Sequence, residues 1–339
     1  MSKHDNPLVG WSVDRAAIKT VGRDLQRPEC ILAEPDGTLW TADARGGVMR
    51  IAADGTQQLI AQQGHSGLAG QDRAKLILGG TLPNGIAFDR NGDILIANFG
   101  TDAIELMRRD GSSRTLHTHI DGRPLGKTNF VLTDSRDRIW FTVTTRLAPW
   151  TRSINEKAPD GYVGVIDDKG IRIAAEGFIG TNEIRFDAKE EWLYVVESNA
   201  RHISRLRAHP DGSLSDREVF GPDRLEGVPD GFAFDAYGNL WVTLVGADRL
   251  IALTPQGEVL TLLDDGDPQK IRRFDEAFFA GRMTPEILTS THGTLAPMMA
   301  SLTFGGPDLR TVYLGSLGGN TLPCFQSPVA GLPLAHWKR

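Results

Sequence analysis

Residues 227–244 read GVPDGFAFDAYGNLWVTL, and one feature of this stretch needs an explanation. A short apolar alternation is followed by a turn rich in Asp, Gly and Asn, and then by an aliphatic and aromatic run. This order predicts two antiparallel strands joined by a turn. Asp230 opens the first strand, where an apolar residue would cost less to bury.

The same plan recurs along the chain. Four clear copies are RPECILAEPDGTLWTAD (27–43), LPNGIAFDRNGDILIAN (82–98), KTNFVLTDSRDRIWFTV (127–143) and GTNEIRFDAKEEWLYVVES (180–198), and a weaker one is ASLTFGGPDLRTVYLGS (300–316). The stretch at 227–244 and each of the four clear copies open on a polar residue. These five opening residues are Glu29, Asn84, Asn129, Asn182 and Asp230. An acid follows five positions later in each copy, at Glu34, Asp89, Asp134, Asp187 and Asp235.

A second pattern lies between the copies. Segments such as GVMRIAADGTQQLI (47–60) and LIALTPQGEVLTLL (250–263) are apolar runs around Asp-Gly or Gln-Gly, a strong hairpin signal. Each unit therefore holds four short antiparallel strands. Six such units predict an all-β, six-bladed β-propeller in one domain over residues 1–339, with residues 16–25 as a closing strand for the last blade. A β-solenoid or a pair of sandwiches fits the four-strand unit less well.

Composition narrows the functional classes. The 339 residues are 40% hydrophobic and 24% charged, and the net charge of −6 offers no basic surface for nucleic acid or an anionic membrane. The first 20 residues lack the apolar run of a signal peptide, and no run of 18 apolar residues follows, so we expect a cytoplasmic protein. Cys30 and Cys324 are expected to be thiols. We expect a monomer or a small homo-oligomer.

In a propeller, residues at one offset in every repeat form a ring around the central channel. The five opening residues should therefore place oxygen-bearing side chains together, and the sixth slot falls on Ala300 or Ser301. Two carboxylates, Glu29 and Asp230, with the amides of Asn129 and Asn182 suit one divalent cation. Ca²⁺ fits best, then Mg²⁺ or Mn²⁺, whereas Zn²⁺ normally recruits His or Cys.

The opposing interpretation is that the opening residues only cap strands. Their varied side chains argue against one shared cap, and the acids at plus five suit that structural role better. Among the histidines, His65 in the segment GHSGLAG (64–70), read as a channel-mouth loop, and His292 are candidates to approach a substrate.

Two insertions interrupt the repeats. Residues 144–161 divide the third blade and offer Arg146, Trp150 and Arg152 for covering a pocket or binding an acid. Residues 265–299 separate the fifth and sixth blades, with a helix expected near residues 270–280 and Phe274, Phe278 and Phe279 on one side of it. Long insertions often form lids or binding loops, although a Phe-rich helix can equally pack on the rim or on a partner subunit.

The chain resembles the senescence marker protein, gluconolactonase and luciferin-regenerating enzyme family of six-bladed propellers, over about residues 27–331. The resemblance rests on Glu29 after Arg-Pro, on TNEIRFD around Asn182, on VPDGFAFDAYGNLWV around Asp230 and on FGGPDL at 304–309. It implies that Glu29, Asn182 and Asp230 hold one divalent metal and that Asn129 is a further ligand or touches substrate. It also implies Asp230 as general base. Lys127 in KTNFV stands in the region where sugar-lactone members often carry an arginine.

The resemblance, together with the predicted metal ring, implies a metal-dependent hydrolase that opens a sugar lactone or related cyclic ester. A cation can polarise the lactone carbonyl, and Asp230 or metal-bound water can supply the nucleophile. Residues expected at the substrate are Asn84, Asn129, Lys127, Arg146, Trp150 and His292. The alternative is a non-catalytic propeller that binds a small molecule or protein around a structural metal.

Overall fold

A computed structural model describes residues 6–63 and 81–338. The expected mouth loop at 64–70, with His65, lies outside these residues. Strands of the first three blades are β2 (Ile31–Ala33), β3 (Leu39–Asp43), β4 (Gly47–Ile51), β5 (Gln57–Ala61); β6 (Pro83–Phe88), β7 (Ile94–Asn98), β8 (Ala103–Met107), β9 (Ser113–His117); and β12 (Thr128–Thr133), β13 (Ile139–Val143), β14 (Gly161–Asp167), β15 (Gly170–Phe178). A small hairpin, β10 (His119–Ile120) and β11 (Arg123–Pro124), joins the second and third blades.

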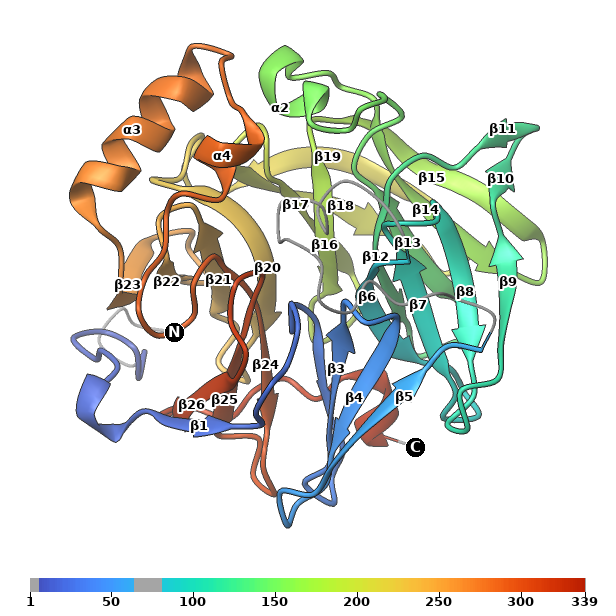
Figure 1. The fold of residues 1–339 in the computed structure, drawn as a ribbon. Helices are drawn as coiled ribbons and strands as arrows, with labels where there is room; N and C mark the ends of the chain where they lie inside the picture. Colours follow the sequence, from blue (N-terminus) through green and yellow to red (C-terminus); the bar gives the residue numbers. More distant parts are fainter. Residues whose placement is uncertain (1–5, 64–80, 339) are drawn as a thin grey trace.

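The other three blades follow the same plan (Figure 1). Their strands are β16 (Thr181–Phe186), β17 (Trp192–Glu197), β18 (His202–Ala208), β19 (Leu214–Phe220); β20 (Val228–Phe234), β21 (Leu240–Val245), β22 (Arg249–Leu253), β23 (Val259–Asp264); and β24 (Met299–Gly305), β25 (Thr311–Ser316), β26 (Leu322–Gln326) with β1 (Lys19–Val21). Strand β1 pairs antiparallel with β26, so the N-terminal part completes the last blade as predicted. Each inner strand contacts the next, and β2 contacts both β6 and β24, which closes the six-bladed propeller.

The acids at plus five have the structural role that the sequence predicts. In three blades the acid accepts a hydrogen bond from the indole of a tryptophan six residues later: Trp40 to Glu34 at 2.6 Å, Trp140 to Asp134 at 2.8 Å, and Trp241 to Asp235 at 2.9 Å. Each of these tryptophans packs edge-on against a phenylalanine of the next blade, with centroids 5.3–6.0 Å apart. The acid therefore fixes the residue that joins neighbouring blades.

The inner strands of blades two to six share a β-bulge. The pairing with the second strand shifts between Pro83 and Gly85, Thr128 and Val131, Thr181 and Ile184, Pro229 and Phe232, and Met299 and Ser301. A bulge leaves a residue out of the ladder and turns its side chain. Threonine hydroxyls on the second strand take up freed backbone groups, since Thr142 accepts from the Phe130 amide and Thr243 from the Gly231 amide.

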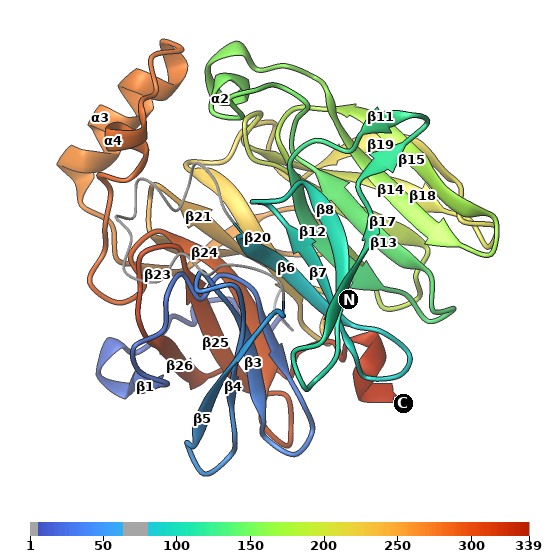
Figure 2. The same cartoon turned by 45° about the vertical axis from the view of Figure 1, so that its right-hand side comes forward.

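Both insertions lie at one end of the channel. Thr128 pairs with Val143 just before the first insertion, and the second insertion ends at the start of β24, so both lie where the inner strands begin. They carry α2 (Arg152–Glu156), α3 (Pro268–Phe279) and α4 (Pro285–Leu288). Figure 2 shows these helices on one side and the C-terminal turn η3 (Ala335–Lys338) on the opposite side. The short turn η2 (Arg15–Ala17) precedes β1.

The predicted helix near residues 270–280 is confirmed as α3, but one detail is wrong. Phe274 and Phe278 are buried in a cluster with Val228 and Val245 on the rim of the fifth blade, whereas Phe279 is 54% exposed. Adjacent helical residues point about 100° apart, so Phe279 cannot share the face of Phe278. Within the described ranges no helix is long and apolar enough to cross a membrane.

Candidate functional site

The bulges place the opening residues of the repeats at one level of the channel. In blades two to five the opening residue lies in the β-bulge of its inner strand. These residues are Asn84, Asn129, Asn182 and Asp230. In the sixth blade this position is Ala300. The bulge explains why a strand that is otherwise buried sheet carries an acid, because the extra residue is turned away from the alternating faces of the blade.

Asp230 is held by its neighbour in the fourth blade. The Asn182 amide nitrogen donates to Asp230 Oδ1 at 2.5 Å and to Ser198 Oγ at 3.1 Å. Ser198 in turn donates to the Pro229 carbonyl at 2.7 Å. These bonds fix the Asn182 amide with its nitrogen toward Asp230, and its oxygen is left buried without a hydrogen-bond partner.

Glu29 is held by a residue outside the predicted set. Arg27 Nη2 lies 2.8 Å from Glu29 Oε2 as an ion pair, and it donates to Asn84 Oδ1 at 2.8 Å. The Asn84 amide nitrogen donates to the Asn129 backbone carbonyl at 3.0 Å. Side chains of the first and second blades are thereby connected to the backbone of the third blade at the same level.

Several polar atoms at this level lack the bonds that burial normally demands. Asn129 Oδ1 and Asn182 Oδ1 are buried acceptors without a hydrogen-bond partner, and the contact of Glu29 Oε2 is its ion pair with Arg27. Arg27 has two such donors, Nε and Nη1. Buried polar groups are usually satisfied, and two amide oxygens without partners beside two carboxylates would suit an electropositive group.

The electrostatics agree with this interpretation. Burial raises the pKa of Glu29 from its ordinary value, against the charge of Arg27 and the Asn84 hydrogen bond. Burial, followed by the charges of Glu29 and Glu183, raises the pKa of Asp230 well above its usual range. Like-charged carboxylates in a desolvated channel raise each other's pKa, and a cation between them would relieve the repulsion.

Glu183 is a third carboxylate in the channel. It accepts from Ser301 Oγ at 2.7 Å and pairs with Arg185 at 2.9 Å, and burial raises its pKa to about 7. Ser301 therefore takes part in the channel although the bulge position of its blade is Ala300. Glu183 lies one level below the ring, because it follows Asn182 in the same strand.

The structure locates the remaining predicted substrate residues around this end of the channel. Lys127 Nζ donates to the Phe99 carbonyl at 3.1 Å and pairs with Asp102 at 2.9 Å. Trp150 packs edge-on against Phe99 at 5.3 Å. The guanidinium of Arg146 lies 4.4 Å from the centre of the Tyr162 ring.

His292 is exposed and lies in the second insertion. The two insertions are joined to each other: the Asn155 side chain accepts from the Met283 amide at 2.8 Å and donates to its carbonyl at 3.1 Å. Phe274 and Phe278 pack α3 on the rim, so the second insertion is anchored to the fifth blade.

Sequence reasoning missed two residues of the site, Arg27 and Glu183. Arg27 lies in the motif RPE with Glu29, and Glu183 lies in the motif TNE with Asn182, but neither occupies the position that recurs in every repeat. Arg27 is two residues before Glu29 and reaches across to the second blade. A charged residue inside an otherwise apolar channel strand was the available signal for Glu183.

The residues present fit a divalent cation. Among residues 6–63 and 81–338, no three His, Cys, Asp or Glu side chains are grouped as a metal site of that type requires. A cation at the ring would thus need amide oxygens besides the carboxylates of Glu29 and Asp230. Orphaned Asn129 Oδ1 and Asn182 Oδ1 supply them, and such hard oxygen donors suit Ca²⁺.

Comparison with known proteins adds sequence relatives. Residues 28–265 match the sequence profile of the SMP-30/Gluconolactonase/LRE-like region. An uncharacterized protein of Sulfolobus acidocaldarius is 28% identical over 48% of this chain and 50% of its own length. The pentonolactonase of Haloferax volcanii is 26% identical over 46% of this chain and 44% of its own. The chain thus spans about half the length of these curated relatives.

Solved structures share the fold. A gluconolactonase of Xanthomonas campestris superposes with a TM-score of 0.66 at 19% identity, covering 92% of this chain and 89% of that one. A calcium-binding protein of Agrobacterium tumefaciens, regucalcin, gives a TM-score of 0.64 at 14% identity, covering 92% and 95%. At these identities the likeness shows the propeller alone.

Proposed function

Because this chain belongs to the SMP-30/gluconolactonase/LRE-like family, we propose that it hydrolyses a lactone with one divalent cation, by preference Ca²⁺. Glu29, Asn129, Asn182 and Asp230 would hold the cation. One observation carries the proposal: two buried carboxylates lie beside amide oxygens that have no hydrogen-bond partner. Such a ring is costly to bury unless a cation and a polar substrate complete it.

The chain's own residues supply the remaining chemistry. When bound, a divalent cation polarises the lactone carbonyl and stabilises the developing oxyanion. Asp230 accepts a proton from the water that attacks the carbonyl carbon, with its carboxylate oriented by the Asn182 amide. As the ring C–O bond breaks, this proton passes to the departing alkoxide oxygen, and a hydroxy acid results.

Arg27 is suited to the acid that this reaction forms. Its Nε and Nη1 are buried donors without partners, next to Glu29 and Asn84. A guanidinium with two N–H groups to spare matches a carboxylate oxygen pair or the oxygen that becomes one. We assign Arg27 to this contact, and Lys127, Arg146, Trp150 and His292 to the mouth through which the substrate enters.

A proton-release assay on a panel of sugar and aliphatic lactones tests the proposal. With Ca²⁺ present we expect acid release for at least one lactone, its loss in chelator and its return when Ca²⁺ is restored. Asp230→Asn should lower kcat/KM by about 10²–10⁴-fold, the usual contribution of a general base. Glu226→Gln removes a carboxylate that is 95% exposed and should leave the rate unchanged.

Thermal unfolding with and without Ca²⁺ separates binding from catalysis. If the dissociation constant is about 10 μM, Ca²⁺ at about 1 mM should stabilise the wild type by about 2.7 kcal/mol, and Asn182→Ala should reduce the effect. Lactone hydrolysis that persists in chelator would refute the role of the cation. Stabilisation by Ca²⁺ without release from any lactone would refute the enzyme and favour a binding propeller.

A further inference from the structure

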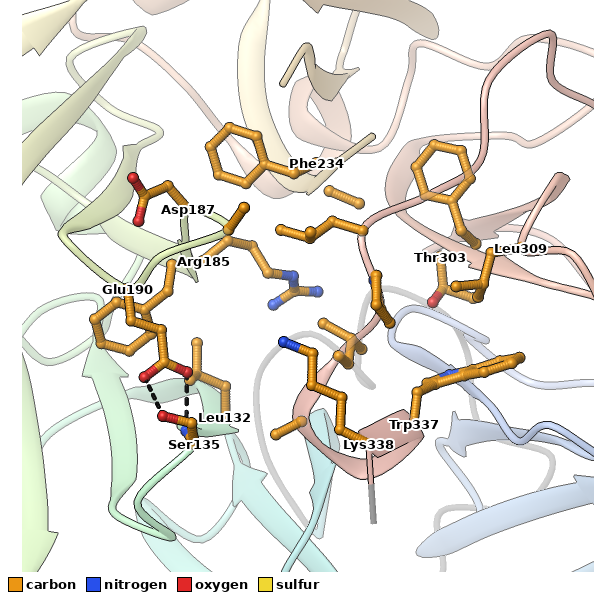
Figure 3. Close-up of a pocket in the computed structure, with 18 of the residues that line it drawn as sticks. Leu132, Ser135, Arg185, Asp187, Glu190, Phe234, Thr303, Leu309, Trp337 and Lys338 are labelled. Atoms are coloured by element: carbon orange, nitrogen blue, oxygen red, sulfur yellow. Dashed lines mark hydrogen bonds between the residues drawn. The ribbon is translucent and has the colours of Figure 1, made fainter. Parts of the chain in front are cut away.

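The opposite end of the channel contains a cavity. Its volume is about 200 Å³, and it lies where the inner strands β12, β16, β20 and β24 end (Figure 3). The C-terminal segment, residues 332–338, contributes a further wall. Asp230 and Phe234 lie four residues apart in β20, about 13 Å at 3.3 Å per residue, and Phe234 is at the end of the strand. A ligand here would therefore not occupy the ring.

The C-terminal segment is fastened across this end of the propeller. The Leu332 amide donates to the Phe234 carbonyl at 2.8 Å, and the Gly331 amide donates to the Leu309 carbonyl at 2.8 Å. The His336 ring nitrogen bonds the Ala33 carbonyl at 2.8 Å. The cavity wall is thus attached to the first, fifth and sixth blades, which makes it a built part of the fold.

Most of the cavity lining is apolar. Phe234, Leu302, Phe304 and Leu309 come from the blades, and Trp337 comes from the C-terminal segment. A cavity of about 150 Å³ with comparable walls holds a benzene molecule. A volume of about 200 Å³ therefore has room for a single ring and one polar group.

Arg185 supplies a buried cation to this apolar cavity. Arg185 is 8% exposed, and Figure 3 shows its side chain pointing into the cavity. Nη2 pairs with Glu183 at 2.9 Å and Nη1 donates to the Ile184 carbonyl at 3.0 Å, while Nε has no hydrogen-bond partner. The Phe130 ring covers the guanidinium at 4.5 Å. Arg185 therefore has one buried donor, Nε, without a partner beside the cavity.

The second cation is Lys338, and neither acid of the lining, Asp187 or Glu190, forms an ion pair with it. Figure 3 shows the Lys338 side chain entering the pocket from the C-terminal turn. Glu190 accepts from the Ser135 amide at 2.8 Å and from its hydroxyl at 2.6 Å. Asp187 accepts from two backbone amides of its own turn. No ion pair of Lys338 occurs within the described part of the chain.

We propose that this cavity binds a small organic carboxylate with an apolar body, such as an aryl or branched aliphatic acid. The carboxylate lies between Arg185 and Lys338, and the ring or alkyl group packs against Phe234, Phe304 and Trp337. Hydrogen bonds to charged donors are stronger than neutral ones, and a neutral ligand of the same shape leaves Lys338 and the Nε donor of Arg185 without an anionic acceptor. An inorganic anion leaves the apolar wall uncovered. This site is independent of the proposed lactone chemistry.

Calorimetric titration of the full chain with 4-methylbenzoate tests the proposal, and 4-methylbenzamide serves as the neutral probe of equal shape. We expect a dissociation constant of about 0.1–1 mM for the acid, given ordinary binding per atom for a ligand of this size. The amide should bind at least about tenfold more weakly. Inorganic sulfate should not compete at equal concentration.

Variants locate the site. Lys338→Gln should weaken binding of the acid by about three- to tenfold, as expected for loss of one charged donor. Lys189→Gln is the matched control, because Lys189 is an exposed lysine of the nearby turn outside the lining. The double variant Arg185→Met/Glu183→Gln removes the buried pair together and should abolish measurable binding.

Four results would overturn the proposal. The amide could bind as tightly as the acid, Lys338→Gln could titrate like the wild type, or the acid could give no saturable heat. Loss of acid binding in Asp230→Asn would place the acid at the ring and also refute it. Lys338 is exposed, so its variant and the acid-to-amide ratio decide the question even if the double variant does not fold.

Discussion

Glu197 offers the sharpest test of how the channel end is held together. It ends β17, pairs in register with Thr181 beside Asn182, and precedes Ser198, which bonds the Asn182 amide. Its side chain is 1% exposed and pairs with Arg217 at 2.7 Å. His202 and the Ile179 amide also bond it, at 3.0 and 2.8 Å.

These contacts set the expected magnitude. Burial raises the pKa of Glu197, but the hydrogen bonds from His202 and Ser204, the Ile179 amide and the charge of Arg217 outweigh it and lower the pKa to about 2. A shift from 4.5 to about 2 corresponds to about 3 kcal/mol of folding free energy at neutral pH. Glu197→Gln should lose this amount, because its NH₂ group cannot accept from the donors that surround it.

The pH dependence has a definite sign. The pKa is depressed in the folded state, so the stabilisation is complete above pH 4.5 and is lost as pH falls toward 2. The contribution of the Glu197 carboxylate should shrink from about 3 kcal/mol at pH 7 to about 1.5 kcal/mol at pH 3.

Denaturant and thermal unfolding of the wild type and Glu197→Gln measure this difference. At pH 7 the melting temperature should fall by about 4 °C, from the usual unfolding entropy per residue. Glu218→Gln is the control, since Glu218 is 49% exposed and pairs with Arg205 at the surface, where loss of the pair should cost under about 1 kcal/mol. Equal destabilisation by both variants, or a Glu197→Gln effect that does not shrink with falling pH, would refute the reasoning.

Three further predictions concern packing and buried charge. Gly231→Ala should destabilise the fold by about 1–3 kcal/mol in denaturant unfolding, because a Cβ there would lie 2.6 Å from the Ala300 carbonyl oxygen; a neutral effect would contradict the close approach of the two inner strands. Burial, followed by the charge of Arg201, lowers the pKa of Lys157 to about 8, so wild-type stability should rise with pH between about 8 and 10.5; Lys157→Met should remove this rise and increase the melting temperature at pH 7, and an unchanged pH profile would speak against it. Burial raises the pKa of Asp248 to about 6 against hydrogen bonds from the Met299 and Gly293 amides, so stability should decline as pH rises from about 4 to 6; Asp248→Asn should flatten this part of the profile, and a variant with the wild-type slope would exclude Asp248 as its source.

The repeated pattern in the chain was sufficient to predict the propeller. Each strand pair and its turn lie within 17 to 19 consecutive residues, so alternation, turn residues and the acid at plus five are all local signals. The closing strand β1 followed from counting, because the sixth blade lacked a fourth strand. The sequence also predicted that Asn84, Asn129, Asn182 and Asp230 lie at the same depth in the central channel. Residues at the same position of each repeat occupy the same position of each blade.

What could not be read from the chain lies in contacts between blades. Arg27 reaches Asn84 across 57 residues, and Glu183 meets Ser301 across 118, so no local window contains either pair. The same holds for the cavity at the opposite end of the channel, where Arg185 and Lys338 come from the fourth blade and the C-terminal turn. Periodicity specifies which face of a strand is buried, but the partner on that face depends on how six separate sheets pack around one axis. The sequence repeat therefore predicted which residues form the ring. The unpaired amide oxygens of Asn129 and Asn182 and the contact of Arg27 are known only from the folded chain.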